Sequence, residues 1–209
     1  MRHLILLRHG QSRINAAQQT QSIFCGQLDT PLTEIGRQQA RDAGRILAES
    51  SKYRISHAVS SSLGRAAETL ELVLQQLHQP PFRFPARAGF NERSLGLFEG
   101  RPEQDVLEQF PEYRDNPQFS AFRADFHQKA PGGENLTEVS QRAHRELLQH
   151  LPYVTDDLLL VSHCQTIRCL IGVLTHASPQ SVMQLQVPNA TPIILARSGP
   201  DRWQITSDD

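Results

Sequence analysis

Continuous apolar runs alternate along the chain with segments of helical periodicity. Three runs of mostly apolar residues predict buried strands, because a strand covered on both faces presents no polar side. These runs span residues 3–8, 55–60 and 157–162. Weaker strands are expected at 82–84, 193–195 and 203–205. The third run is the clearest, since four apolar residues follow one another from Leu158 to Val161.

Between these strands, apolar residues recur at the spacing of one helix face. Helices are predicted at 33–49, 63–77, 136–150 and 165–174. Thr33 stands where an N-cap is expected, and Pro80-Pro81 ends the second helix. Strands that alternate with helices form a parallel sheet covered on both faces. The pattern therefore predicts an α/β fold, a three-layer sandwich with a mostly parallel central sheet and helices on both faces.

The stretch from about residue 94 to 133 has a different character. It carries several prolines and many acidic and aromatic residues, and it shows no long apolar period. We expect one or two short helices here, forming a small cap insertion that covers the site. Phe119, Phe122 and Phe126 are spaced as on a helix, which favours packing inside the cap over contact with a ligand. In the absence of repeats and long linkers, residues 1–209 are expected to form a single domain.

Composition narrows the classes of function. Hydrophobic residues make up 38% and charged residues 21% of the 209 residues, as in a globular protein. The formal net charge of −1, with no run of five like charges, argues against a nucleic acid or a membrane as partner. The apolar run after Met1 is too short for a signal peptide or a membrane span. Three sparse cysteines suit a reducing, cytoplasmic location, and a homodimer is an open possibility.

Polar residues follow three of the predicted strands directly. The first strand ends in Arg8-His9, the second leads through serines to Arg65, and the strand at 157–162 leads to His163. Parallel strands end at one edge of a sheet, so two histidines and two arginines are expected to converge there. Arginine binds phosphate bidentately, and a histidine between arginines can attack phosphorus to give a covalent phosphohistidine. The convergence therefore predicts phosphoryl chemistry.

Each of these residues also has a simpler interpretation. A single histidine after a strand is commonly structural, and a single arginine is commonly a surface residue. No histidine pair has the HxH, HxxxH or HExxH spacing of a metal site. The arginines and His163 already supply the positive charge that a metal would bring, so we expect no metal and no other cofactor. The agreement among all three strand ends is what favours a phosphate site.

Six segments, in order along nearly the whole chain, resemble the histidine phosphatase (phosphoglycerate mutase-like) superfamily. They span residues 7–15, 31–40, 62–69, 91–100, 131–134 and 161–168. The Arg-His-Gly triplet at the end of the first strand is a poor signal by itself. Six motifs in the order of the family are a specific one.

The resemblance implies a role for each matching residue. His9 would be the phosphorylated nucleophile, and Glu92 would be the general acid that protonates the leaving oxygen and later the base that activates water. The residues implied to hold the phosphoryl oxygens are Arg8, Asn15, Arg65 and His163. The residues implied to line the same pocket, partly through their backbone, are Ser12, Gly26 and Gln27. Without the resemblance, Glu92 is most simply a surface carboxylate paired with Arg93.

The same pocket serves phosphatases and mutases in this superfamily. Residues 95–100 resemble the broad-specificity phosphatase branch, and the chain is shorter than the mutases that it resembles. We therefore expect metal-independent hydrolysis of a small phosphorylated metabolite, with phosphoglycerate mutase-type transfer as the alternative. A non-catalytic phospho-ligand binding module is a further alternative. The presence of His9, Glu92 and His163 together argues against it.

Cys164 departs from the family pattern, because glycine usually follows the second histidine. A thiol beside a cluster of cations could have a lowered pKa and be sensitive to oxidation. The simpler interpretation is a small thiol that packs against its own helix.

Overall fold

A six-stranded sheet forms the centre of the molecule. The computed structural model describes residues 2–18, 20–78, 80–114, 122–199 and 202–206. The strand order is β3-β2-β4-β1-β5-β6. The strands are β1 (His3–Arg8), β2 (Ile55–Ser60), β3 (Phe82–Arg83), β4 (Asp157–Ser162), β5 (Pro192–Gly199) and β6 (Arg202–Ile205). The first four run parallel to one another, whereas β5 and β6 are antiparallel to their neighbours.

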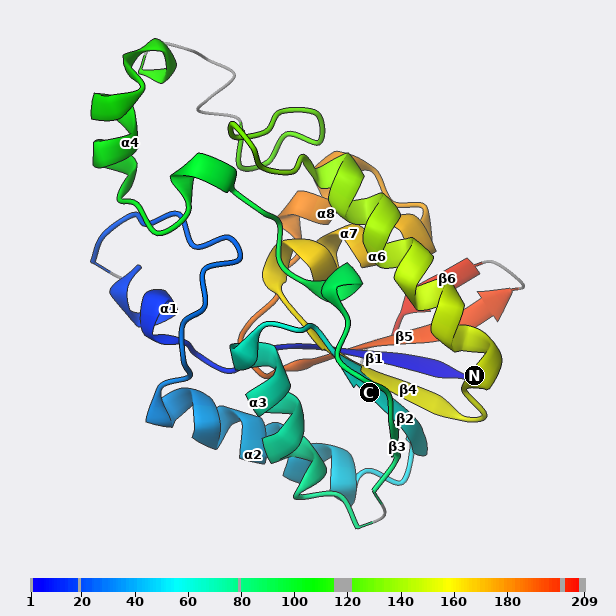
Figure 1. Cartoon of the computed structure of the whole chain (residues 1–209). Coiled ribbons are helices and arrows are strands. Elements are labelled where there is room, and N and C mark those ends of the chain that lie inside the picture. Colours follow the sequence, from blue (N-terminus) through cyan, green and yellow to red (C-terminus); the bar gives the residue numbers. More distant parts are fainter. Residues whose placement is uncertain (1, 19, 79, 115–121, 200–201, 207–209) are drawn as a thin grey trace.

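Helices cover both faces of this sheet (Figure 1). On one face α2 (Glu34–Glu49) packs with α3 (Gly64–Leu74), and on the other α6 (Leu136–His150) packs with α7 (Cys164–Thr175). The expected three-layer α/β sandwich is therefore confirmed.

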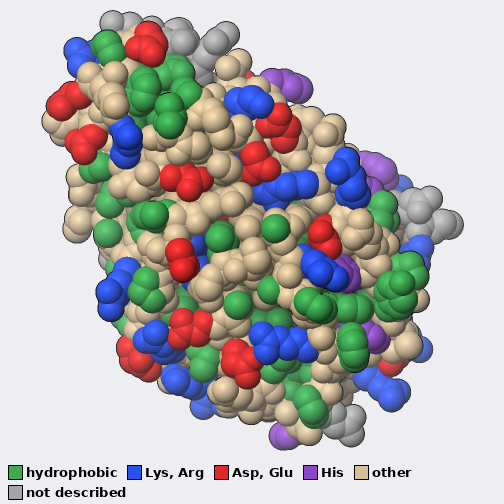
Figure 2. Space-filling view, in the orientation of Figure 1, with side chains coloured by type: hydrophobic (Ala, Val, Ile, Leu, Met, Phe, Trp, Pro, Cys, Tyr) green, Lys and Arg blue, Asp and Glu red, His purple; other side chains and the backbone are tan. Residues whose placement is uncertain are grey.

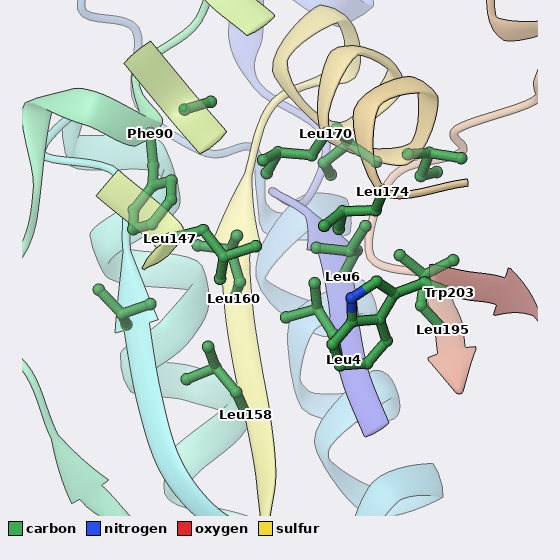
Figure 3. Close-up of a cluster of buried hydrophobic side chains, with 14 of the residues drawn as sticks. Leu4, Leu6, Phe90, Leu147, Leu158, Leu160, Leu170, Leu174, Leu195 and Trp203 are labelled. Carbon is green, nitrogen blue, oxygen red and sulfur yellow. The ribbon is translucent and has the colours of Figure 1, made fainter. Parts of the chain in front are cut away.

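The central strands are apolar throughout because they face two cores. In β1, Leu4 and Leu6 join the cluster under α6 and α7, whereas Ile5 and Leu7 join the cluster under α2 and α3. Figure 3 shows the first of these clusters, in which Leu160 of β4 lies with the β1 leucines. Successive side chains of a strand point to opposite faces, so a strand between two helical layers needs an unbroken apolar run.

The main helices begin and end close to their predicted positions. Thr33 is the N-cap of α2, where its side chain accepts a hydrogen bond from the backbone of Gly36. A capping box of Asn135 and Glu138 begins α6, which has the predicted bounds. The third helix, α3, ends at Leu74, three residues earlier than predicted.

Two short helices were not predicted from the sequence pattern. They are α1 (Arg13–Ala17) and α8 (Pro179–Gln184). Neither is long enough to complete two turns, so no apolar period can reveal it. Capping explains where they start, since Ser12 forms a capping box with Asn15 and Ser178 caps α8.

The loop after β1 contacts α2 backbone to backbone. A Cβ atom on Gly10 would lie 2.2 Å from the carbonyl oxygen of Gly36, and a Cβ on Gly36 would lie 2.1 Å from that of Gln11. The N–H of Gly10 also donates to Thr69 Oγ1 of α3 at 3.0 Å. This close approach fixes the segment that follows β1, and it requires glycine on both sides.

Between β3 and α6 the chain leaves the sandwich and forms an extension above it (Figure 1). We call residues 94–114 and 122–133 the cap. The elements along this part of the chain are η1 (Ala88–Phe90), η2 (Gly96–Phe98), α4 (Glu103–Gln109) and η3 (Pro111–Tyr113). The core of the cap is an apolar cluster of Phe24, Phe98, Val106, Phe122 and Ala130.

Phe24 in this cluster comes from the loop of residues 20–28, which lies far from the cap in the sequence. The loop pairs with the cap through hydrogen bonds from Phe24 N to Arg101 O and from Glu103 N to Ser22 O, both 2.9 Å long. The cap is therefore assembled from two separate parts of the chain. Periodicity within residues 94–133 could not show the contribution of this loop.

The helical interpretation of Phe119, Phe122 and Phe126 needs correction. Residues 122–126 form turns and bends instead of a helix, and Phe119 lies outside the described residues. Phe122 and Phe126 nevertheless pack against apolar side chains, as predicted. Phe122 is buried in the cap, and Phe126 packs against a second cluster around Leu136.

The outer surface mixes both signs of charge. Figure 2 shows acidic and basic side chains interspersed over one face of the molecule. No helix in the described parts of the chain has the length and hydropathy to cross a membrane.

Candidate active site

A cleft opens where the strands β1, β2 and β4 end and the cap begins. Its empty space amounts to about 770 Å³, which includes open solvent at its mouth. Arg8 and His9 come from the end of β1, Arg65 from the start of α3, and Glu92 from the segment after η1. The convergence expected from parallel strand ends is thus realised, since residues far apart in the sequence line one cleft.

His9 is buried, with 4% of its surface exposed, and its ring is held in one orientation. Nδ1 lies 2.7 Å from the carbonyl oxygen of Gly10. A carbonyl oxygen only accepts hydrogen bonds, so Nδ1 carries the proton and Nε2 carries the lone pair. Burial lowers the pKa of His9 well below its usual value, and the charges of Arg65 and Arg8 lower it further. The ring is therefore neutral, with Nε2 as its nucleophilic atom.

Arg65 holds His9 and a neighbouring loop at once. Its Nε donates to Nε2 of His9 at 3.3 Å. Its two terminal nitrogens donate to the carbonyl oxygens of Leu28 at 2.7 Å and Gly26 at 3.0 Å. The side chain is 1% exposed, so this cation sits in a place of low dielectric, where it acts strongly on a bound anion.

Arg8 supplies the second positive charge beside His9. One terminal nitrogen donates to the carbonyl oxygen of Val187 at 2.9 Å. Its Nε is buried and, among the described residues, has no hydrogen-bond partner. Unpaired buried donors are rare in proteins, and a donor in a cleft is satisfied when an anion binds.

His163 lies behind His9 and not in the wall of the cleft. The two rings are 5.0 Å apart between centroids, and His163 is completely buried. Its Nε2 lies 2.8 Å from Ser61 Oγ, whose own proton goes to Asn91 Oδ1 at 2.8 Å. Ser61 Oγ therefore accepts from His163, and Nδ1 of His163 is left without a partner among the described residues. Burial and the charges of His9, Arg65, Arg8 and Arg142 hold the pKa of His163 well below its usual value.

Glu92 lies at the N-terminus of α7. Its carboxylate accepts hydrogen bonds from the backbone N–H groups of Arg93 at 2.9 Å and of Gln165 and Thr166 at 3.3 Å. The positive end of the helix dipole stabilises a carboxylate in this place. The simple alternative, an ion pair with Arg93, is not what the structure has. The guanidinium of Arg93 donates to three backbone carbonyls instead.

The remaining predicted pocket residues divide into two groups. Asn15 and Gly26 line the cleft. Ser12 and Gln27 are absent from the described residues that line it, although both lie next to it. Ser12 caps α1, and the side-chain amide of Gln27 donates to the carbonyl oxygen of Glu92 at 2.9 Å. Both residues thus hold their neighbours in position.

Asn189 is a contact of His9 that the sequence did not indicate. Its amide nitrogen donates to the carbonyl oxygen of His9 at 2.7 Å. It reaches this place because β5 runs antiparallel to β1, so the residues before β5 meet the end of β1. A sequence pattern that gives strands but not their directions cannot indicate such a contact.

The outer wall of the cleft was foreseen only in part, through the cap expected to cover the site. It is formed by the end of α1, the 20–28 loop, Arg93, the cap and the start of α7. Its residues include Gln18, Ile23, Phe24, Cys25, Arg93, Leu95, Phe122, Arg123, Cys164 and Gln165. A cationic residue of the outer wall, Arg123, belongs to the segment where we expected the cap insertion.

Cys164 and Cys25 both line the cleft, and burial raises the pKa of each thiol, that of Cys25 to about 11. The charges of Arg65 and Arg8 act in the opposite direction but have less effect than burial. The structure therefore favours the simpler interpretation of Cys164, a small packed thiol, since it also packs against the core under α6 and α7. Among the described residues, no cluster of three or more His, Cys, Asp or Glu side chains is arranged to hold a metal ion.

The chain belongs to the histidine phosphatase superfamily (branch 1), because the model of that family matches residues 4–207. It is an enzyme of this superfamily, either a phosphatase or a mutase. The 2,3-bisphosphoglycerate-dependent phosphoglycerate mutase of Azorhizobium caulinodans is 33% identical over 204 residues, which cover 96% of this chain and 94% of the relative. The same enzyme of Nitrobacter hamburgensis is 32% identical over 196 residues, 92% and 90% of the two chains.

Solved structures of hydrolases share the fold. The structure of mycobacterial hydrolase 1 matches with a TM-score of 0.81 at 26% identity, covering 99% of this chain and 98% of that chain. The mycobacterial glucosyl-3-phosphoglycerate phosphatase in complex with VO3 matches with a TM-score of 0.79 at 26% identity and the same coverage. Sequence relatives thus carry the name of a mutase, and structural neighbours carry the names of hydrolases.

Proposed function

We propose that this protein is a metal-independent phosphatase that hydrolyses small phosphomonoesters through a phosphohistidine on His9. The observation that supports this most directly is the state of the His9 ring. Its Nδ1 proton is held by Gly10, and Nε2 has its lone pair in a cleft beside Arg8 and Arg65. A neutral imidazole between two guanidinium groups is suited to attack the phosphorus of a bound phosphate.

In the first step, Nε2 of His9 forms a bond to phosphorus while the bond from phosphorus to the ester oxygen breaks. Glu92 gives its proton to the departing oxygen, so that the alcohol leaves as a neutral molecule. Charge that develops on the phosphoryl oxygens is met by Arg8 and Arg65, whereas His163 donates from Nε2 to Ser61 and lies behind His9. Asn15, on the wall of the cleft, offers its amide to the same oxygens.

In the second step, water replaces the alcohol. Glu92 takes a proton from this water as its oxygen bonds to phosphorus, and the bond from phosphorus to Nε2 breaks. Inorganic phosphate leaves, and His9 returns to its neutral state. The opening of the cleft to the solvent gives water access to the phosphohistidine.

Mutase activity is the second candidate. The curated relatives at 30–33% identity that cover over nine tenths of this chain carry the name phosphoglycerate mutase. A mutase uses the same nucleophile and acid but returns the phosphoryl group to the substrate. Hydrolysis and transfer therefore differ in what reaches the phosphohistidine second, water or an alcohol.

The deciding experiment measures both products from the same incubations. The protein is given 3-phosphoglycerate, with and without 2,3-bisphosphoglycerate, and a panel of other phosphomonoesters in the presence of EDTA. We expect release of inorganic phosphate and little 2-phosphoglycerate. Rapid formation of the 2-phospho isomer with little free phosphate would instead establish the mutase. Loss of all turnover in EDTA, restored by a divalent ion, would contradict the metal-independent mechanism.

The nucleophile is tested by substitution. His9→Ala is expected to lower kcat by about 10⁴-fold or more, since the covalent step is removed. Its matched control is His144→Ala on α6, a histidine that does not line the cleft. Unfolding curves should show that both variants are folded. Turnover by His9→Ala at a substantial fraction of the wild-type rate would remove His9 from the role of nucleophile.

A further inference from the structure

The cleft continues into a second hollow on its outer side. This hollow has about 650 Å³ of empty space, open solvent at its mouth included, and it shares Gln18, Ile23 and Arg123 with the cleft. Its other lining residues are Thr20, Gln21 and Ser22. We call it the outer hollow. Apart from Ile23, its side chains end in amide, hydroxyl or guanidinium groups, which form hydrogen bonds with the hydroxyl groups of a ligand. An ester whose phosphate lies beside His9 would extend its alcohol part in this direction.

Arg123 stands at the junction of the two spaces and is held from several sides. Its terminal nitrogen donates to Glu103 Oε2 and to Ser22 Oγ, each at 2.9 Å. Ser22 Oγ in turn donates to Glu103 Oε2 at 2.6 Å. The guanidinium carbon lies 4.4 Å from the centre of the Phe24 ring. The side chain is therefore placed before any ligand arrives, and the carboxylate of Glu103 balances its charge.

The other cations along the described walls have different tasks. Arg8 and Arg65 lie beside the nucleophile, where they meet the phosphate. Arg93 donates from Nε and both terminal nitrogens to the carbonyl oxygens of Glu134, Phe122 and Gln128. Glu92 adds a negative charge to the same cleft. A second anionic group on a substrate would thus meet Arg123 close to the negative charge of Glu103.

We propose that the Glu103–Arg123 pair makes this site selective for phosphomonoesters whose alcohol part is uncharged and rich in hydroxyl groups. This inference rests on the proposed phosphatase function. Hydroxyl groups can bond to the amides, to Ser22 and to Arg123 without separating the pair. A carboxylate or a second phosphate must either displace Glu103 or lie near it, and both cost binding free energy.

Glycerol 3-phosphate and 3-phosphoglycerate test this selectivity as a matched pair. The two esters differ in one group, a hydroxymethyl in the first and a carboxylate in the second. We expect the wild-type protein to have the higher kcat/KM for glycerol 3-phosphate. Glu103→Gln keeps the size of the side chain but removes its charge. This variant should shift the ratio of the two kcat/KM values toward the carboxylate ester by about three- to fivefold, the upper part of the range expected for a partly exposed charge pair.

Glu108→Gln is the matched control. Glu108 lies on the same helix, α4, and its carboxylate accepts a hydrogen bond from Gln104 instead of an arginine. This variant changes the net charge by the same amount but leaves the Glu103–Arg123 pair intact. Its ratio of the two kcat/KM values should stay within about twofold of the wild-type ratio.

Binding measurements separate this inference from the proposed function. His9→Ala protein cannot form the phosphohistidine, so calorimetric Kd values for the two esters report selection without turnover. We expect tighter binding of glycerol 3-phosphate, and a shift toward 3-phosphoglycerate when Glu103→Gln is added. Hydrolysis that depends on His9, with a ratio that Glu103→Gln does not change, would overturn the selectivity and leave the phosphatase in place. The expected Kd shift, found for a protein that shows no phosphatase activity, would support the selectivity and overturn the phosphatase.

Discussion

Two buried arginines, Arg65 and Arg93, lie on the cleft and do different things. Arg65 is 1% exposed and Arg93 is 2% exposed. Each uses its guanidinium to hold loops through backbone carbonyl oxygens. Arg65 keeps its Nε for His9, whereas Arg93 donates all three of its nitrogens to carbonyls of the cap and the segment after it.

The comparison shows that burial of a charged residue in a cleft does not by itself mark chemistry. Burial lowers the pKa of Arg93, but nearby carboxylates and the Cys169 thiol offset part of that effect. What separates the two residues is the atom that each arginine contacts. One reaches the proposed nucleophile, and the other ties residues 122, 128 and 134 to the segment that carries Glu92. We call these two arginines clamps: Arg65 is the clamp of the inner pocket around His9, and Arg93 is the clamp of the cap.

The largest difference between the two clamps is expected in catalysis. Arg65→Lys keeps a positive charge but cannot reach His9, Gly26 and Leu28 together, since lysine lacks the planar fork. We expect kcat/KM to fall by about 10²- to 10³-fold. Steady-state kinetics on a small phosphomonoester measure this effect. A fall of less than fivefold would mean that Arg65 only supports the loop, as Arg93 does.

The second difference is expected in stability. Arg93→Lys leaves carbonyl oxygens of the cap without donors, which should cost about 2–4 kcal/mol of unfolding free energy. We expect KM to rise while kcat on a small activated ester stays within about fivefold, because the residues beside His9 are untouched. Denaturant unfolding and steady-state kinetics on the same protein check both parts. A collapse of kcat with unchanged stability would place Arg93 in the chemistry.

The pH dependence follows from the inner pocket. Burial and the arginine charges hold the pKa of His9 and of His163 well below the ordinary value of 6.5. Both rings stay neutral in the folded protein as the pH falls through 6.5, so nucleophilicity should persist in mild acid. A kcat/KM profile with an acidic limb at the ordinary histidine pKa would contradict this.

The same histidines should make folding stability depend on pH. Below pH 6.5 the unfolded chain binds protons at these positions and the folded chain does not. Stability from this source is therefore fully present above pH 6.5 and declines as the pH falls. Denaturant midpoints measured from pH 7.5 to pH 5 should decrease, and the decrease should be smaller in His163→Ala, which retains one of the two groups.

The smallest effect is expected at Cys164, which lines the cleft but has no hydrogen bond to Arg65 or Arg93. Burial raises the pKa of its thiol, so little thiolate exists at neutral pH. Cys164→Ser should change kcat/KM by less than about threefold, as for a side chain without a role in the transition state. The rate of alkylation by iodoacetamide should be slow beside that of a small free thiol. Rapid alkylation with loss of activity would show a reactive cysteine.

The sequence alone determined the layers of the fold and the centre of the site. The apolar run of β1 and the run of β4 predict strands covered on both faces, and the alternation with helices makes them parallel. Parallel strands bring their ends together, so Arg8, His9, Arg65 and His163 could be placed at one edge before any contact was known. These inferences depend on the spacing of apolar residues, which can be read within a stretch of about ten residues without knowledge of the rest of the fold.

The tertiary structure decided how those residues are held and what surrounds them. Asn189 reaches His9 across 180 positions of the chain because β5 is antiparallel, and Phe24 enters the cap from the separate loop of residues 20–28. The proton on Nδ1 of His9 is fixed by a carbonyl oxygen, which every residue carries and no sequence distinguishes. Contacts of this kind depend on strand direction and loop path. A local pattern of side chains does not encode either one, because many sequences with the same pattern can follow different paths.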